Sequence, residues 1–197
     1  MRIIAGEFRG RRLDAPKGDG TRPTTDRVRE SLMSAIHSAR GGFAGARALD
    51  AFAGSGALGM EALSRGAVSA VFCERDRGAA DVIERNMRTL GLNRDTARLM
   101  RGDVLKRLPA PMAGAPFDLV FLDPPYALGA AEVFDLLGRL DAAGSLAGDV
   151  LASYEHDGAH DAAVEALAVE RGWDIVSHRR FGDTAVDFLE RSVQDDG

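Results

Sequence analysis

The sequence has little of several residue types, and each scarcity excludes a class of protein. It contains one cysteine, Cys73, among 197 residues, which excludes an internal disulfide framework and favours a reducing compartment. No apolar run reaches about 18 residues, so a membrane-spanning helix is not expected. The arginines near the N-terminus are not followed by an apolar stretch, as they would be in a signal peptide. We therefore expect a cytoplasmic protein without a membrane anchor.

Metal ligands and reactive thiols are equally scarce. The histidines are His37, His156, His160 and His178, and none has ligand spacing with Cys73, so we predict no metal. Cys73 falls inside an apolar run, where a small buried side chain is expected. Chemistry that needs a nucleophilic cysteine, such as methylation of a pyrimidine ring carbon, is therefore not predicted.

The rest of the sequence predicts one α/β domain with a small N-terminal addition, and its length suffices for a substantial core. Apolar runs alternate with segments of helical periodicity, which is typical of a doubly wound, mostly parallel, Rossmann-like sheet. The acidic residues that follow four of these runs are Asp50, Glu74, Asp103 and Asp123. Because such sheets bind ligands beyond the carboxyl ends of their strands, we expect the four carboxylates to share one edge.

A short predicted strand ends at Asp50 and is followed by a glycine-rich loop and the start of a helix. Gly54, Gly56 and Gly59 match the dinucleotide pattern G-x-G-x-x-G, so a nicotinamide-dependent oxidoreductase is one alternative. Asp50 argues against it, because a carboxylate at the strand end opposes the pyrophosphate that such a loop binds. The cationic end of S-adenosylmethionine suits this position better. We predict that Gly54, Ser55 and Gly56 bind this cofactor, since glycines allow close approach to the backbone.

The order of the acids predicts a role for each of them toward this cofactor. Asp50 is expected near the methionine amine and Asp103 near the adenine amine. Glu74 follows Asp50 by 24 residues, close to the spacing at which an acid holds ribose hydroxyls. Asp123 is expected at the reaction centre.

Asp123 opens the tetrapeptide Asp123-Pro124-Pro125-Tyr126, directly behind the apolar run 117–122. The prolines stiffen the turn, and the residue before a proline favours the extended geometry of a strand end. Asp123 can accept a hydrogen bond from an exocyclic amine, and Tyr126 offers a face on which a base stacks. We predict that these four residues hold a flat, amine-bearing ring during catalysis, although the tetrapeptide also occurs in plain turns.

The first 40 residues carry a basic excess on an acidic chain. They hold nine Lys or Arg and five Asp or Glu, whereas the whole chain has a net charge of −5. A basic element of this kind suits contact with the phosphate backbone of a nucleic acid. The alternative is that the excess reflects a general preference for arginine, since the chain has only two lysines. The predicted RNA-binding residues are Arg2, Arg9, Arg11, Arg12, Arg22, Arg27 and Arg29. Residues 1–13 predict a β-hairpin, and Thr24 or Thr25 is predicted to cap a helix that ends at Gly41-Gly42.

The C-terminal third predicts how the sheet ends. Two further helices flank a predicted fifth strand at residues 150–154. Residues 173–181 and 185–189 are predicted to pair as an antiparallel hairpin across Gly182-Asp183. A parallel sheet that ends in such a hairpin favours a methyltransferase over a dinucleotide-binding enzyme.

Residues 1–6, 22–30, 52–59, 61–67 and 123–126 together resemble the RsmD family of bacterial 16S ribosomal RNA guanine-N2 methyltransferases. The resemblance implies a class I methyltransferase fold, with S-adenosylmethionine as cofactor and S-adenosylhomocysteine as product. It also implies a 16S ribosomal RNA partner, presented within a small-subunit assembly particle. We place an RNA-contacting extension at 1–40, the catalytic domain at 41–193 and a polar tail at 194–197, in a monomer.

Other classes of protein share part of this pattern. DNA adenine or cytosine amino-methyltransferases and protein-glutamine methyltransferases use the same tetrapeptide chemistry, but residues 22–30 favour the ribosomal substrate. A non-catalytic RNA-binding module would share only the fold. Under the favoured hypothesis the base leaves its stack, and Asp123 and the Pro124 carbonyl accept its amine protons. The methyl group then passes in line from the sulfonium to the nitrogen.

Overall fold

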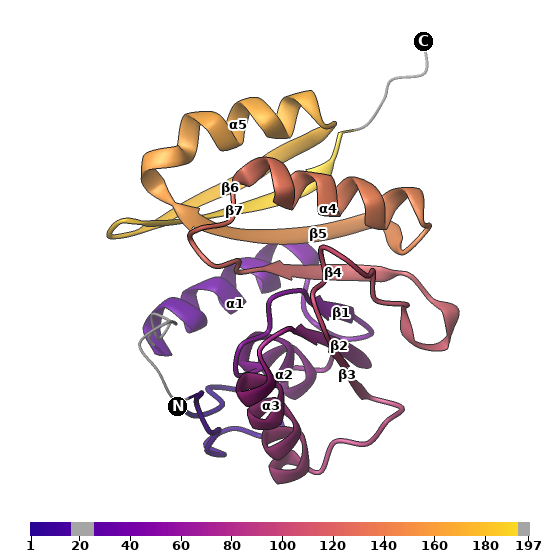
Figure 1. The fold of residues 1–197 in the computed structure, drawn as a ribbon. Helices are drawn as coiled ribbons and strands as arrows, with labels where there is room; N and C mark the ends of the chain where they lie inside the picture. Colours follow the sequence, from indigo (N-terminus) through magenta and orange to yellow (C-terminus); the bar gives the residue numbers. More distant parts are fainter. Residues whose placement is uncertain (17–25, 193–197) are drawn as a thin grey trace.

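The computed structural model describes residues 1–16 and 26–192 (Figure 1). Its helices are α1 (Asp26–Arg40), α2 (Ala57–Ser64), α3 (Arg77–Leu90), α4 (Ala130–Ala142) and α5 (Asp161–Glu170), with short 3-10 helices at Met112–Gly114 and Gly158–His160. Its strands are β1 (Arg47–Asp50), β2 (Ser69–Glu74), β3 (Ala97–Arg101), β4 (Phe117–Leu122), β5 (Leu146–Asp157), β6 (Trp173–Phe181) and β7 (Thr184–Arg191). The predicted helix caps Thr24 and Thr25 and the predicted RNA contact Arg22 lie outside the described residues.

The strands form one sheet in the order β3-β2-β1-β4-β5-β7-β6. β3, β2, β1, β4 and β5 run parallel, whereas β7 is antiparallel to its two neighbours. Gly182, with a φ of 67°, lies in the turn of the β6–β7 hairpin. The predicted fold class is therefore confirmed: an α/β, Rossmann-like methyltransferase sheet that is mostly parallel and ends in an antiparallel hairpin.

β5 is longer than the sequence predicts. The apolar pattern predicts residues 150–154, whereas the strand runs from Leu146 to Asp157. Leu146 lies opposite Phe117 of β4, and Asp157 lies opposite Thr184 of β7. Main-chain pairing with two different neighbours thus holds both ends of β5, and the residue pattern of one segment does not reveal such pairing.

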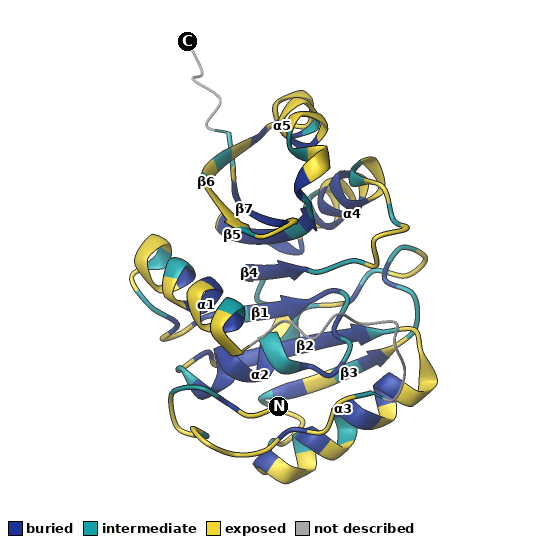
Figure 2. Ribbon diagram, turned by 90° about the vertical axis from the view of Figure 1, so that its left-hand side faces the viewer, coloured by how far each residue is buried: buried dark blue, intermediate teal, exposed yellow. Residues whose placement is uncertain are grey.

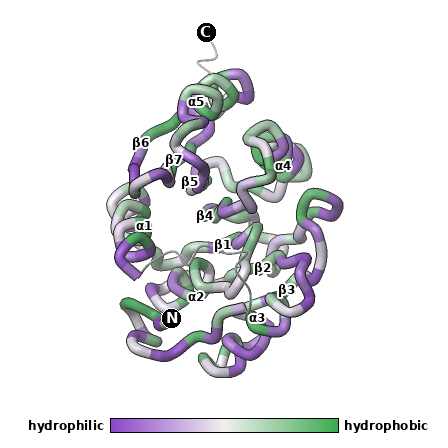
Figure 3. The backbone as a smooth tube through the Cα atoms, turned by 60° about the vertical axis from the view of Figure 1, so that its left-hand side comes forward, coloured by the Kyte–Doolittle hydropathy of each residue, from purple (hydrophilic) through white to green (hydrophobic). Residues whose placement is uncertain are grey.

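Helices cover both faces of the sheet, with α1 on one side of β1 and β4 and α4 on the other (Figures 2 and 3). Along β2, Ala70 and Phe72 pack in the core with α1, α2 and α3, while Val71 and Cys73 pack in the core with α4 and α5. Cys73 is buried as predicted, and burial raises the pKa of its thiol. Within the described part of the chain, no helix is long and apolar enough to span a membrane.

The N-terminal segment turns back on itself without forming the predicted regular hairpin. Arg2 and Arg12 form a single antiparallel bridge, and the Ile3 amide donates across the turn at 2.9 Å. Ile3 and Leu13 are buried in the same core as α1 and α2. Residues 1–16 therefore have no separate core, and their conformation depends on the helices against which they pack.

A buried ionic network joins this segment to α1 and α2. Glu61 of α2 accepts a hydrogen bond from the Ile4 amide at 2.6 Å, and the same carboxylate oxygen lies 3.4 Å from Nε of Arg29. The other oxygen of Glu61 lies 3.3 Å from Nε of Arg65, and Arg29 also pairs with Asp26 at 2.9 Å. Glu61 and Arg29 are buried, so water cannot solvate their charges. The hydrogen bonds and ion pairs of this network take the place of that water.

Two histidines share one buried carboxylate in the C-terminal part of the sheet. Asp187 of β7 lies 2.8 Å from the ring of His156 and 2.6 Å from the ring of His178. Burial by itself would raise the pKa of Asp187, but the hydrogen bonds from the two histidines lower it below its usual value. These contacts fasten β5, β7 and β6 to one another. Among the described residues there is no cluster of side chains suited to a metal ion.

Candidate active site

The strand register gathers the four predicted acids at one edge of the sheet. Asp50 is the last residue of β1. Its partner in β2 is the residue two places before Glu74, and its partner in β4 is the residue two places before Asp123, which directly follows that strand. Asp103 follows β3, whose last residue, Arg101, lies opposite Glu74. The acids thus share the carboxyl edge, as the sequence predicts, while the ligand group that each one binds stays a prediction.

Asp50 is buried and fixes the start of α2. Its carboxylate accepts a hydrogen bond from the Gly59 amide at 3.0 Å, in the first turn of the helix. Burial raises the pKa of Asp50 to about 7; the Gly59 hydrogen bond acts against this rise, and the charges of Asp123 and Glu74 add to it. A cationic ligand would favour the ionised form of this acid.

The glycine loop leaves open space beside its backbone at Gly54. Gly54 and Gly56 have φ angles of 54° and 79°, a region that favours glycine. A Cβ at Gly54 would meet no protein atom within 4 Å, and the Gly54 amide donates to Glu74 at 2.8 Å. Ser55 is buried, with its hydroxyl 3.5 Å from the sulfur of Met1. Backbone is thus open beside Gly54, whereas Ser55 and Gly56 pack inward, and the predicted binding of a cofactor by this loop stays a prediction.

Asn86 of α3 supports this loop, a role that our sequence reasoning missed. Its side chain is buried and donates to the Ser55 carbonyl at 3.0 Å. It also exchanges hydrogen bonds with the main chain of Asp14, at 2.8 and 3.1 Å. Asn86 thus ties the N-terminal segment to the glycine loop. The available signal was a polar residue on the apolar face of a helix, between Ile83 and Leu90.

Gly59→Ala is expected to lower the free energy of unfolding by about 1–3 kcal/mol, the usual cost of overpacking. A Cβ at Gly59 would lie 2.5 Å from the Phe72 ring, so the start of α2 must move. Urea unfolding measures the loss. Gly138→Ala is the matched control, because a Cβ there, in α4, meets nothing within 4 Å. Equal stability of the two variants would contradict the steric argument.

Main-chain groups orient the carboxylates of Glu74 and Asp103. The two oxygens of Glu74 accept hydrogen bonds from the amides of Gly54 at 2.8 Å and Asp76 at 2.7 Å. Asp103 accepts one from the Leu105 amide at 3.0 Å. Each carboxylate keeps further lone pairs, so ribose hydroxyls or an adenine amine can still donate to it.

The Asp-Pro-Pro-Tyr motif continues β4 into a turn at the carboxyl edge. Asp123 and Pro124 are half-buried, whereas the Tyr126 side chain is 59% exposed. The Leu128 amide donates to the Pro125 carbonyl at 2.8 Å and so completes the turn. Desolvation raises the pKa of Asp123 to about 6. The motif therefore offers a hydrogen-bond acceptor close to an exposed aromatic face.

The predicted RNA-binding arginines do not all lie on the surface. The exposed ones are Arg2, Arg9, Arg11, Arg12 and Arg27. Arg29, in contrast, is buried: besides its pairs with Asp26 and Glu61, it donates to the Arg2 carbonyl at 2.6 Å. The prediction that Arg29 contacts RNA is wrong, because its guanidinium already serves partners inside the protein.

Known proteins match this chain in both sequence and fold. The family described as Conserved hypothetical protein 95 matches residues 1–190. Ribosomal RNA small subunit methyltransferase D of Escherichia coli is 35% identical over 98% of this chain and 91% of its own length. The protein of the same name from Haemophilus influenzae is 42% identical over 67% of each chain. The chain belongs to the RsmD family.

The solved structures agree with this RsmD-family membership. The Escherichia coli protein yhhF superposes with a TM-score of 0.78 and 35% identity, covering 98% of this chain and 99% of that one. The segments that suggested the family also meet in space. Ile4, Arg29 and Glu61 come from three of them and form the buried network between the N-terminal segment, α1 and α2.

Proposed function

We propose that this RsmD-family protein methylates the exocyclic N2 amine of a guanine in 16S ribosomal RNA, within a small-subunit assembly particle. The observation that carries the proposal is the position of Asp123 and Tyr126 at the sheet edge that Asp50 and Glu74 share, where the glycine loop is open at Gly54. The name of the Escherichia coli and Haemophilus influenzae relatives supports the substrate class.

The residues at this edge suit S-adenosylmethionine. Asp50 would face the cationic methionine end, Glu74 the ribose hydroxyls and Asp103 the adenine amine. The open backbone at Gly54 has room for close approach of the cofactor. When bound, the cofactor supplies an electrophilic methyl group on its sulfonium.

The motif positions the base that receives the methyl group. Unstacking the guanine costs a few kcal/mol, and stacking on Tyr126 offsets about 1–3 kcal/mol of this cost. Asp123 and the Pro124 carbonyl accept the two N–H groups of the amine, which turns the nitrogen lone pair toward the methyl group. Such positioning accounts for about 7–11 kcal/mol in intramolecular reactions. The methylated nitrogen then releases its extra proton to Asp123 or to water.

Affinity for S-adenosylmethionine is expected to fall as the pH drops below about 7. The pKa of Asp50 is raised to about 7 in the free protein, and a neighbouring cation favours its ionised form. Binding below this pH must therefore release a proton, and affinity should fall by up to about tenfold per pH unit. Calorimetry in buffers of different ionisation enthalpy measures the release. Affinity that is constant from pH 5.5 to 8 would contradict the role of Asp50.

The function itself is tested with labelled S-adenosylmethionine and unmodified 16S ribosomal RNA, both naked and assembled into small-subunit particles. Nucleosides from the digest are identified by mass spectrometry. We expect N2-methylguanosine, with the assembled particle as the better substrate. Methyladenosine or methylcytidine would overturn the guanine assignment. Transfer only to DNA or to protein glutamine would overturn the RNA substrate.

A further inference from the structure

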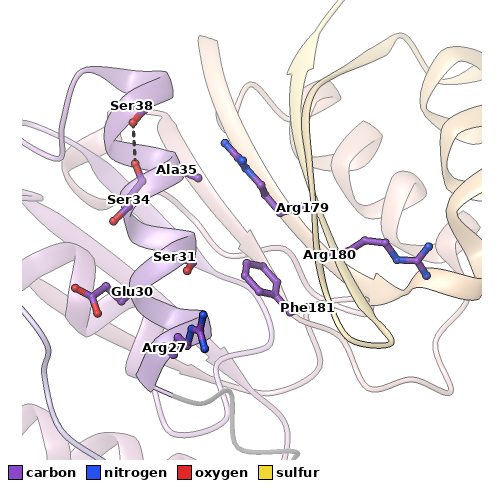
Figure 4. Close-up of a pocket in the computed structure, with 9 residues that line it drawn as sticks. All are labelled: Arg27, Glu30, Ser31, Ser34, Ala35, Ser38, Arg179, Arg180 and Phe181. Atoms are coloured by element: carbon purple, nitrogen blue, oxygen red, sulfur yellow. Dashed lines mark hydrogen bonds between the residues drawn. The ribbon is translucent and has the colours of Figure 1, made fainter.

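A groove of about 590 Å³ lies between α1 and the end of β6 (Figure 4). None of the four acids is among its lining residues. Its wall on α1 is formed by Arg27 together with Ser31, Ser34 and Ser38, of which Ser38 donates its hydroxyl to the Ser34 carbonyl at 3.1 Å. Its wall on β6 presents Arg179 and Phe181. The groove is therefore polar and basic, with an aromatic ring at one end.

The strand register places this aromatic end at the catalytic edge of the sheet. One row of paired residues crosses four neighbouring strands, from β4 through β5 and β7 to β6. The residues of this row are Leu122, Tyr154, Asp187 and His178. Phe181, three residues after His178, thus lies on the carboxyl side of the sheet, where the Asp-Pro-Pro-Tyr motif also lies. Three strand spacings separate β4 from β6, a lateral distance of roughly 14 Å. A strand of nucleic acid that leaves the motif can therefore reach the groove.

The charges in the groove favour a polyanion. Arg27 and Arg179 are exposed and face the groove from opposite walls, and Glu30 is the one acid among its lining residues. Arg180 borders the groove but directs its guanidinium to the other face of the sheet, where it pairs with Asp161 at 3.3 Å. Arginine and serine side chains are common donors to phosphate oxygens, and aromatic rings stack with unpaired bases.

We propose that this groove holds the single-stranded RNA next to the target base, with its phosphates on Arg27 and Arg179 and a base against Phe181. The proposal rests on the proposed function and extends it, because it assigns a second contact surface to the substrate. This surface adds Arg179, Phe181 and three serines to the basic N-terminal residues.

Binding of a small-subunit ribosomal RNA fragment, measured over a salt series, tests this groove. Arg179→Ala is expected to weaken binding about three- to tenfold, whereas Arg180→Ala, with the same charge change on the opposite face, leaves it within about twofold. The double variant Arg27→Ala/Arg179→Ala should lower the salt slope by about 1.4, the value for two phosphate contacts on a single strand. Affinity for S-adenosylmethionine should not change.

A tethered probe locates the RNA. Cys73 is buried, so Ser34→Cys, an exposed position, allows selective attachment of an iron chelate that cleaves nearby RNA. We expect cleavage within a few nucleotides of the target guanine. Remote cleavage, or equal effects of the Arg179 and Arg180 substitutions, would overturn the proposal. If the Arg179 substitution leaves binding of the RNA fragment unchanged and weakens methylation only of the assembled particle, the groove contacts a ribosomal protein instead of RNA. If the wild type binds RNA without methylating it, the proposed function fails, while the comparison of variants still decides the groove.

Discussion

Asp123→Asn is expected to lower kcat for RNA methylation by about 10²–10³, while affinity for S-adenosylmethionine stays nearly unchanged. Asparagine keeps the size of the side chain but removes the charge that orients the amine. Losses of this size follow when one preorganised hydrogen-bonding group is removed from an active site. Single-turnover kinetics at saturating RNA measure the effect, and calorimetry measures the cofactor affinity.

Two comparisons separate this role from a merely structural one. Desolvation raises the pKa of Asp123 to about 6, and the carboxylate must be ionised to accept the amine proton, so wild-type kcat should fall at or below about pH 6. Asp123→Asn should lose this dependence. Tyr126→Ala should instead raise KM for RNA, because base stacking contributes about 1–3 kcal/mol to binding. Equal loss of kcat and cofactor affinity in Asp123→Asn would contradict the catalytic assignment of Asp123.

Glu61→Ala is expected to lower the free energy of unfolding by about 3–5 kcal/mol. The substitution leaves the buried guanidinium of Arg29 without its buried partner and the Ile4 amide without its acceptor. Breaking a buried ion pair by removing one partner costs this much because an uncompensated charge remains inside the protein. Urea unfolding followed by circular dichroism gives the difference.

The control for this prediction removes both buried charges together. Arg29→Met combined with Glu61→Gln should be less destabilised than Glu61→Ala, because no unpaired charge is left in the core. Arg101→Ala removes an exposed arginine that pairs with Asp81 and Glu84, and it should not change stability measurably. A double variant as unstable as Glu61→Ala would show that packing, and not charge, is the source of the loss.

Much of the fold and part of the site could be predicted because local patterns determine them. The alternation of apolar runs and helical segments predicts the parallel sheet, and an acid behind each run predicts the shared edge. Arg29 and Asn86 could not be placed in this way. Both are polar residues on helices whose partners, such as Glu61 and Ser55, lie about 30 residues away in the sequence.

The sequence by itself determined the order of strands and helices, the glycine loop, the Asp-Pro-Pro-Tyr motif and the burial of Cys73. Each of these depends on neighbours within one segment or on the general rule that parallel strands end at one edge. Only the tertiary structure decided that Arg29 is an interior residue and that Arg179 faces α1 while Arg180 faces away. Arg29 is interior because its buried partner Glu61 belongs to another helix, 32 residues away in the sequence. Arg179 and Arg180 differ because side chains alternate between the two faces of a strand, and the helix packed against each face is set by chain crossovers far away in the sequence.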